Sequence, residues 1–163
     1  LRITFEKRQR WTLISIALML GADIVVAADD CRFSQLEVKR CIMPTGGATL
    51  RMAERAGLGN AMLHLLTGDE FNSAEAYRLN FVQKVVPAGQ ELDAAITIAH
   101  NIAEQAPAAV VATRLNTLKA VEQGPAAAVA EFIETQRVLA NSEDAAEGIR
   151  SFVERRPARF TGR

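Results

Sequence analysis

A single carboxylate precedes a glycine pair in residues 33–52, "FSQLEVKRCIMPTGGATLRM". Glu37 lies between two apolar residues, where partial burial would suit a general acid or base. Gly46 and Gly47 come just before a helical pattern, so backbone N–H groups there could bind an anion or a carbonyl oxygen. The alternatives, from these residues alone, are a solvent-exposed glutamate and an ordinary turn.

Four further residues have side chains that commonly do chemistry, but their spacing favours structural roles. His64 and His100 have no Ser, Asp or Cys partner at a catalytic spacing, so we expect packing or surface positions. Cys31 and Cys41 form neither a CxxC motif nor a Cys/His cluster, which argues against a metal site. We expect both thiols to be buried, small apolar groups in a reducing compartment, the cytoplasm.

The last residues of the sequence are basic. Arg155, Arg156, Arg159 and Arg163 occur within "RRPARFTGR". Guanidinium groups at this density either clamp a phosphate or belong to a solvated tail.

The elements that carry these residues alternate in residues 1–87. Hydrophobic patterns and turn residues predict helix, strand and extended segments in an α/β layered arrangement. The predicted helices are 12–20, 48–56, 59–68 and 73–80, the last with a capping box at Asn72 and Glu75; the strands are 23–28 and 81–87, and an extended segment ends near Glu37.

Residues 88–163 have the pattern of an all-helical region. Apolar residues recur at helical spacing over 92–103, and Pro107 is suited to the first turn of a second helix. A third helix is predicted to start at Pro125 and extend through Leu139, and Ser142 is expected to cap a fourth. Pro87 therefore divides the predicted α/β part from the predicted helical part.

Composition excludes several functional classes. The sequence has 163 residues, enough for one domain of ordinary size, with 19 basic and 19 acidic residues. This balance attracts neither nucleic acid nor an anionic membrane. The apolar run of residues 11–20 is too short to span a bilayer, and Asp23 follows it, so we expect no membrane segment.

Three ordered blocks of the sequence resemble the crotonase superfamily, of the enoyl-CoA hydratase and isomerase type. The first, "GADIVVAADDCRFSQLEVKRCIMPTGGATLRM", matches the family at Ala22, Asp23, Ile24, Ala27, Phe33, Gln35, Glu37, Pro44, Gly46, Gly47 and Arg51. "LLTGDEFNSAEAYRLNFVQKVVP" and "EGIRSFVERRPARFTGR" match the second and third blocks. The resemblance covers nearly all residues from about 18 onward.

The resemblance implies both a fold and a substrate class. It implies a spiral of ββα turns, of which residues 1–87 would be the C-terminal portion, followed by a helical region that forms trimers, often paired into hexamers. An acyl-CoA thioester would be the substrate, with coenzyme A entering only as part of it and no other cofactor. Residues 1–16 match the family poorly, and we expect the chain to lack its N-terminal part.

The resemblance assigns roles of the family's site residues to individual residues of this sequence. The family's second catalytic glutamate corresponds to Glu37, whereas its first corresponds to Ala17, which cannot transfer a proton. Backbone N–H groups near Ile14 and Ser15 correspond to part of an oxyanion hole that would hold the thioester oxygen. Pro44, Gly46 and Gly47 belong to the predicted substrate-binding segment.

The C-terminal block implies two contacts with coenzyme A. Phe152 corresponds to a residue near the adenine, and Arg155 to one near the phosphates; the alternative for Phe152 is a core side chain of its helix. The resemblance thus predicts a hydratase or isomerase that uses Glu37. The alternative, which Ala17 favours, is a non-catalytic CoA-ester-binding or assembly subunit.

Overall fold

The computed structural model describes residues 3–6, 10–11 and 14–163, and the chain divides into two compact units. Unit 1 is Leu1–Thr97 and unit 2 is Ile98–Arg163. This division falls inside helix α5 (Glu91–Ala103) instead of at Pro87, where the sequence pattern changes. Among the described residues, no helix is both long and apolar enough to cross a membrane.

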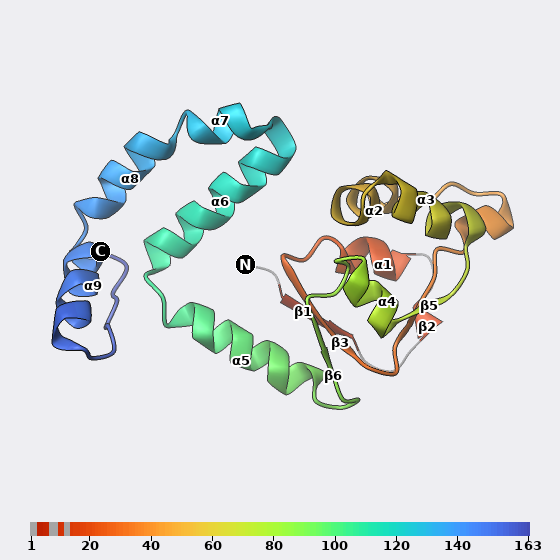
Figure 1. The fold of residues 1–163 in the computed structure, drawn as a ribbon, viewed down its shortest axis with the longest axis horizontal. Helices are drawn as coiled ribbons and strands as arrows, with labels where there is room; N and C mark the ends of the chain where they lie inside the picture. The colour runs from red at the N-terminus through yellow and green to blue at the C-terminus, as the bar shows by residue number, and fades with distance from the viewer. Residues whose placement is uncertain (1–2, 7–9, 12–13) are drawn as a thin grey trace. The chain divides into compact units, whose positions relative to one another are not determined.

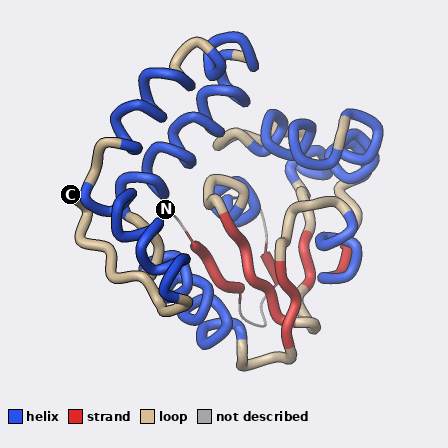
Figure 2. Tube along the Cα trace, turned by 60° about the vertical axis from the view of Figure 1, so that its left-hand side comes forward, coloured by secondary structure: helices blue, strands red, loops and turns tan. Residues whose placement is uncertain are grey.

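Unit 1 contains two small sheets (Figure 2). The first has the order β1-β3-β6 and is entirely parallel, with Ile3 opposite Ile24 and Val26 opposite Lys84. Its strands are β1 (Ile3–Glu6), β3 (Ile24–Ala28) and β6 (Lys84–Val86). The second consists of β2 (Arg10–Trp11), β4 (Arg32–Phe33) and β5 (Phe71–Asn72). The central strand β3 is buried after its first residue, as its continuous apolar sequence predicts.

The helices of unit 1 follow the predicted order (Figure 1). They are α1 (Ile14–Met19), α2 (Ala48–Ala56), α3 (Leu58–Thr67), α4 (Ser73–Arg78) and the greater part of α5. Residues 12 and 13 of the first predicted helix lie outside the described residues. Asn72 Oδ1 accepts the Glu75 N–H at 2.9 Å, which confirms the Asn72 half of the predicted capping box; the Glu75 carboxylate instead accepts hydrogen bonds from Arg78.

One local prediction is wrong at the residue of greatest interest. Glu37 does not end an extended segment: β4 stops at Phe33, and Glu37 is the first residue of a 3₁₀ turn, η1 (Glu37–Arg40). Cys41 ends this turn in the left-handed conformation, with φ of 57°. Alternation of apolar and polar residues cannot reveal such a short turn, because it spans only four residues.

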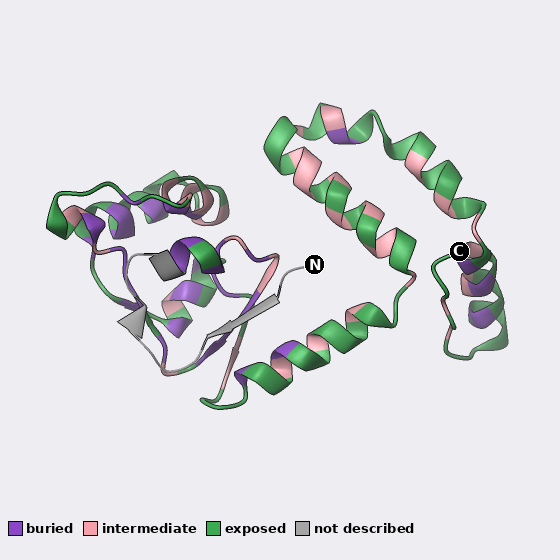
Figure 3. Ribbon diagram, turned by 180° about the vertical axis from the view of Figure 1, so that it is seen from behind, coloured by how far each residue is buried: buried purple, intermediate pink, exposed green. Residues whose placement is uncertain are grey.

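The core of unit 1 lies between α1, the strands and α2 to α4 (Figure 3). Phe71 is central, because its ring centroid is 5.6 Å from that of Phe33 and 6.0 Å from that of Phe81. His64 is buried and its ring centroid is 4.4 Å from that of Phe71. The packing role expected for His64 is therefore confirmed.

Unit 2 is helical throughout its ordered elements. These are α6 (Pro107–Gln123), α7 (Pro125–Val129), α8 (Phe132–Ala140) and α9 (Glu143–Glu154), after the end of α5. The single helix predicted from Pro125 through Leu139 is instead α7 and α8. In unit 2, all of which the structure describes, Ala128 is the only buried apolar residue.

Candidate functional site

Glu37 is buried, and the surface-glutamate alternative is wrong. Its exposed fraction is 5%, and its Oε2 has no hydrogen-bond partner among the described residues. A buried carboxylate oxygen without a donor is energetically costly, so such groups are concentrated where chemistry or ligand binding uses them. Glu37 is therefore the first candidate residue of unit 1.

The backbone around Glu37 is fixed by hydrogen bonds within its own turn. The Ile42 N–H donates to the Glu37 carbonyl at 3.1 Å, and the Lys39 N–H donates to the Leu36 carbonyl at 3.0 Å. The Cys41 N–H donates to the Val38 carbonyl at 3.4 Å. Because Cys41 is exposed, the prediction that both thiols are buried holds only for Cys31.

Gln35 is a polar residue whose importance the sequence pattern did not reveal. It is fully buried, and neither its Oε1 nor its Nε2 has a hydrogen-bond partner among the described residues. It precedes Glu37 by two positions. The family match included Gln35, but no pattern in the sequence itself could distinguish it from a surface amide.

The glycine pair forms a turn that packs against α1. Gly46 and Gly47 have φ of 68° and 89°, a region that disfavours residues with a side chain, and Gly47 is the N-cap of α2. A methyl group added to Gly46 would lie 3.0 Å from Cβ of Ala17. Arg51 Nη1 donates to the Gly46 carbonyl at 2.8 Å and reaches the Ala17 carbonyl at 3.5 Å.

The structure thus brings together the turn, Ala17 and Arg51, the residue that joins α2 to both. Pro44, which precedes the turn, is buried. Arg51 hydrogen-bonds the turn to α2 and also reaches α1 at the Ala17 carbonyl, and among the described residues no hydrogen bond joins the turn to Glu37. Ile14 and Ser15 are the first two residues of α1, where N–H groups have no intrahelical partner; their side chains lie outside the described residues.

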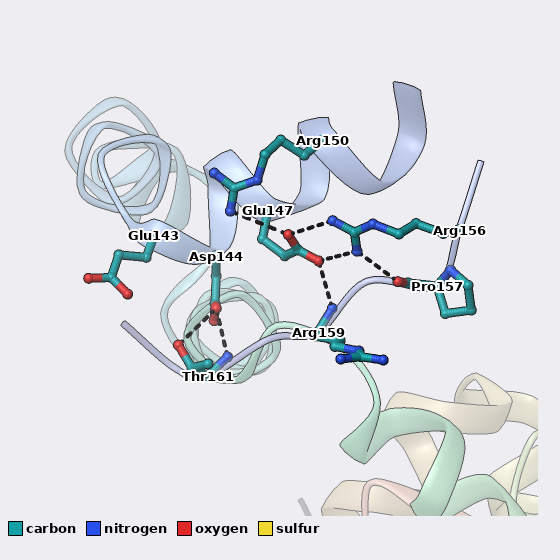
Figure 4. Close-up of a pocket in the computed structure, with 8 residues that line it drawn as sticks. All are labelled: Glu143, Asp144, Glu147, Arg150, Arg156, Pro157, Arg159 and Thr161. Carbon is teal, nitrogen blue, oxygen red and sulfur yellow. Dashed lines mark hydrogen bonds and ion pairs between the residues drawn. The ribbon is translucent and has the colours of Figure 1, made fainter. Parts of the chain in front are cut away.

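In unit 2 a cluster of ion pairs joins α9 to the C-terminal tail (Figure 4). Glu147 accepts hydrogen bonds from Arg156 Nη1 at 2.6 Å and Nη2 at 3.0 Å, and from the Arg159 N–H at 3.0 Å. The Arg156 guanidinium, followed by the Arg159 backbone N–H, lowers the pKa of Glu147 from 4.5 to about 2. Asp144 accepts the N–H groups of Thr161 at 2.7 Å and Gly162 at 2.8 Å.

These contacts bear on the choice left open between a phosphate clamp and a solvated tail. Arg156 is paired with Glu147 and Glu154, so it is a structural group of the tail. A pocket of about 550 Å³ lies beside this network and is lined by Glu143, Asp144, Glu147, Arg150, Arg156, Pro157, Arg159 and Thr161. Because acidic groups already pair with Arg150 and Arg156, we interpret the network as a fastening of the tail and not as an anion site.

Phe152 and Arg155 lie near the end of α9. Phe152 is 85% exposed, so it is not a core side chain of its helix. Arg155 is exposed and caps α9 in the left-handed conformation, with φ of 53°. Their predicted contacts with adenine and phosphate stay predictions. No group of three His, Cys, Asp or Glu residues suited to a metal ion occurs in the part of the chain that the structure describes.

Comparison with known proteins decides the family. A family model described as enoyl-CoA hydratase/isomerase matches residues 15–163, which includes the Glu37 segment, the glycine turn and α9. The chain belongs to the enoyl-CoA hydratase/isomerase family. A probable enoyl-CoA hydratase of Mycobacterium bovis is 32% identical over 146 residues, which is 90% of this chain and 57% of that protein.

Two further relatives agree with this assignment. A carnitinyl-CoA dehydratase of Proteus mirabilis is 31% identical over 150 residues, with 90% of this chain and 58% of that protein covered. The crystal structure of a probable enoyl-CoA hydratase/isomerase from Mycobacterium abscessus superimposes with a TM-score of 0.92 at 46% identity, covering 97% of this chain and 60% of that one. The predicted α/β crotonase-like fold is confirmed. The chain thus spans 57 to 60% of the length of these three relatives.

Proposed function

We propose that this protein processes acyl-CoA thioesters, with Glu37 as the general acid or base. The carboxyl group would move a proton at the α-carbon of the acyl chain or on an attacking water. The observation that carries this proposal is the burial of Glu37 with Oε2 left without a donor. A carboxylate oxygen that is buried and has no donor among the described residues is available to a substrate.

The thioester oxygen would be held by backbone N–H groups. Those of Ile14 and Ser15 lie in the first turn of α1, where no intrahelical carbonyl competes for them. Pro44, Gly46 and Gly47 would contribute the substrate-binding turn, which already contacts α1 through Ala17. Negative charge that develops on the thioester oxygen during proton transfer would be stabilised there.

Proton transfer by one carboxylate favours isomerisation of a double bond over hydration. Hydration in this family uses two glutamates, and the position of the first is Ala17 here. An isomerase can remove and return a proton with one group. Hydratase activity remains the expectation from family membership. Coenzyme A enters only as part of the substrate.

The test replaces the carboxylate by its neutral isostere. With Glu37→Gln, we expect turnover of an enoyl-CoA to fall about 10²- to 10⁴-fold, because the amide cannot exchange a proton. Crotonyl-CoA tests hydration through loss of enoyl absorbance, and a 3-enoyl-CoA tests isomerisation through its gain. Glu54→Gln, at an exposed position of α2, is the matched control. Equal turnover in Glu37→Gln and wild type would contradict the proposal.

A second candidate is a non-catalytic CoA-ester-binding or assembly subunit, and Ala17 is the observation that favours it. Phe152 would stack on adenine and Arg155 would pair with phosphate, which the exposure of both side chains permits. Thermal stabilisation by coenzyme A without turnover of either substrate would support this candidate. The apolar surface of unit 2 also supports assembly into the homotrimer or hexamer that the family resemblance implies.

A further inference from the structure

We propose that the C-terminal end of α3 and the two residues that follow it, residues 67–69, position Glu37 for the reaction, and that Gly68 is the main positioning residue. This inference rests on the proposed function. Because Glu37 Oε2 has no donor, hydrogen bonds to that oxygen do not fix it in place. Its location depends on the backbone of residues 35–39 and on what packs against that backbone.

Gly68 lies against this segment on both sides of Glu37, at the backbone of Gln35 and at the side chain of Lys39. It is buried with φ of 62°, and a methyl group added to it would lie 2.9 Å from the carbonyl oxygen of Gln35. The same methyl group would lie 3.2 and 3.3 Å from two carbons of the Lys39 side chain. Only glycine permits this approach, because real Cβ atoms do not lie that close to a backbone oxygen.

An ion pair completes the contact. Lys39 Nζ lies 2.9 Å from Asp69 Oδ1, and the hydrogen bond from Lys39 lowers the pKa of Asp69. Both side chains are largely exposed, so the pair adds little by itself and the close approach of Gly68 carries the inference.

Residues 67 and 68 are held by hydrogen bonds to carbonyl groups of α3. The Gly68 N–H donates to the His64 carbonyl at 3.1 Å, and Thr67 Oγ1 donates to the Leu63 carbonyl at 2.7 Å. His64 is itself buried against Phe71 in the core of unit 1. In this proposal, α3 packs in the core of unit 1 and so fixes where Gly68, and with it Glu37, lies.

The test compares two glycines that follow helices. Gly68→Ala and Gly57→Ala both place a side chain at positive φ, 62° and 75°, and the strain is larger at Gly57, because its ψ of 158° is essentially restricted to glycine, which makes it a stringent control for strain. Only Gly68 meets another group, because nothing lies within 4 Å of a methyl group at Gly57. We expect Gly68→Ala to lower kcat for an enoyl-CoA about 10- to 100-fold with little change in KM, and Gly57→Ala to leave kcat unchanged.

A second readout does not depend on turnover. In protein labelled with ¹³C-glutamate, the Glu37 ¹³Cδ resonance is assigned by its loss in Glu37→Gln. We expect it to shift in Gly68→Ala and to stay in place in Gly57→Ala. If Gly68→Ala does not fold, Asp69→Asn carries the same measurement at an exposed position, with a smaller shift expected.

The outcomes separate the two proposals. An unshifted resonance in Gly68→Ala, or in Asp69→Asn if the former does not fold, would overturn the positioning role. A shifted resonance in a protein whose wild type turns over no enoyl-CoA would support positioning and contradict the enzymatic function. A shift of equal size in Gly57→Ala would show that strain alone moves Glu37, which also overturns the inference.

Discussion

Two buried carboxylates in this chain have opposite surroundings. Glu147 accepts three hydrogen bonds from Arg156 and the Arg159 backbone, whereas Glu37 Oε2 has no donor among the described residues. Glu147 is therefore ionised near neutral pH and holds the C-terminal tail against α9. Glu37 has one buried oxygen without such a structural commitment. Burial alone therefore does not identify a catalytic group, and the hydrogen-bond partners distinguish the two.

The Glu147 pair predicts a dependence of stability on pH. Because the folded-state pKa of Glu147 is about 2 against 4.5, its contribution is complete above pH 4.5 and disappears as pH falls through that range toward 2. Arg156→Met should therefore lower the thermal midpoint near neutral pH, and the difference from wild type should shrink below pH 4.5. Circular dichroism melts at several pH values measure this.

Arg137→Met is the control for that experiment. Arg137 pairs with Glu134 at 2.7 Å, but both side chains are about two-thirds exposed, so its loss should change the midpoint little at any pH. A difference between Arg156→Met and wild type that stays constant down to pH 2 would contradict the linkage.

At the scale of elements, the sequence predicts helix starts well where the signal is local. Asn72, Pro107 and Ser142 stand where α4, α6 and α9 begin, because capping and proline preference act within one turn. The 3₁₀ turn at Glu37 was missed because it spans only four residues, and the burial of Gln35 was missed because tertiary packing, which local patterns do not record, produces it. The break between α7 and α8 was also missed, because neither glycine nor proline marks it.

The cap of α4 gives a prediction of its own. Asn72→Ala removes the acceptor of the Glu75 N–H and should lower the free energy of unfolding by about 1 kcal/mol. Asn72→Gly should cost only a few tenths of a kcal/mol, because glycine is also a favourable N-cap residue. Urea unfolding followed by circular dichroism measures both. Equal losses in the two variants would show that the cap is not the cause.

For the whole molecule, the main feature is the apolar surface of unit 2. A helical unit whose only buried apolar residue is Ala128 has little core of its own, and its large apolar side chains are left exposed. They are Val111, Leu115, Val121, Val129, Phe132, Ile133, Val138, Ile149, Phe152 and Val153. This surface is the physical support for the proposed trimer or hexamer.

Assembly is tested with one charge in that surface. Ile133 is 84% exposed, and Ile133→Asp should shift the protein from the proposed trimer toward the 17.7 kDa monomer in light scattering after size exclusion, because an interface cannot bury the charge. Gln123→Asp adds the same charge at an exposed polar position and should leave the mass unchanged. A wild-type monomer would contradict the proposed assembly.

The conformation of Cys41 has a practical consequence. The sequence has two cysteines; Cys31 is buried and Cys41 is exposed at the end of η1. A maleimide fluorophore or a nitroxide therefore attaches selectively at Cys41 without mutagenesis. Since the Cys41 N–H donates a hydrogen bond to the carbonyl of Val38, the next residue after Glu37, such a probe would register motion of the segment that carries Glu37 when a ligand binds.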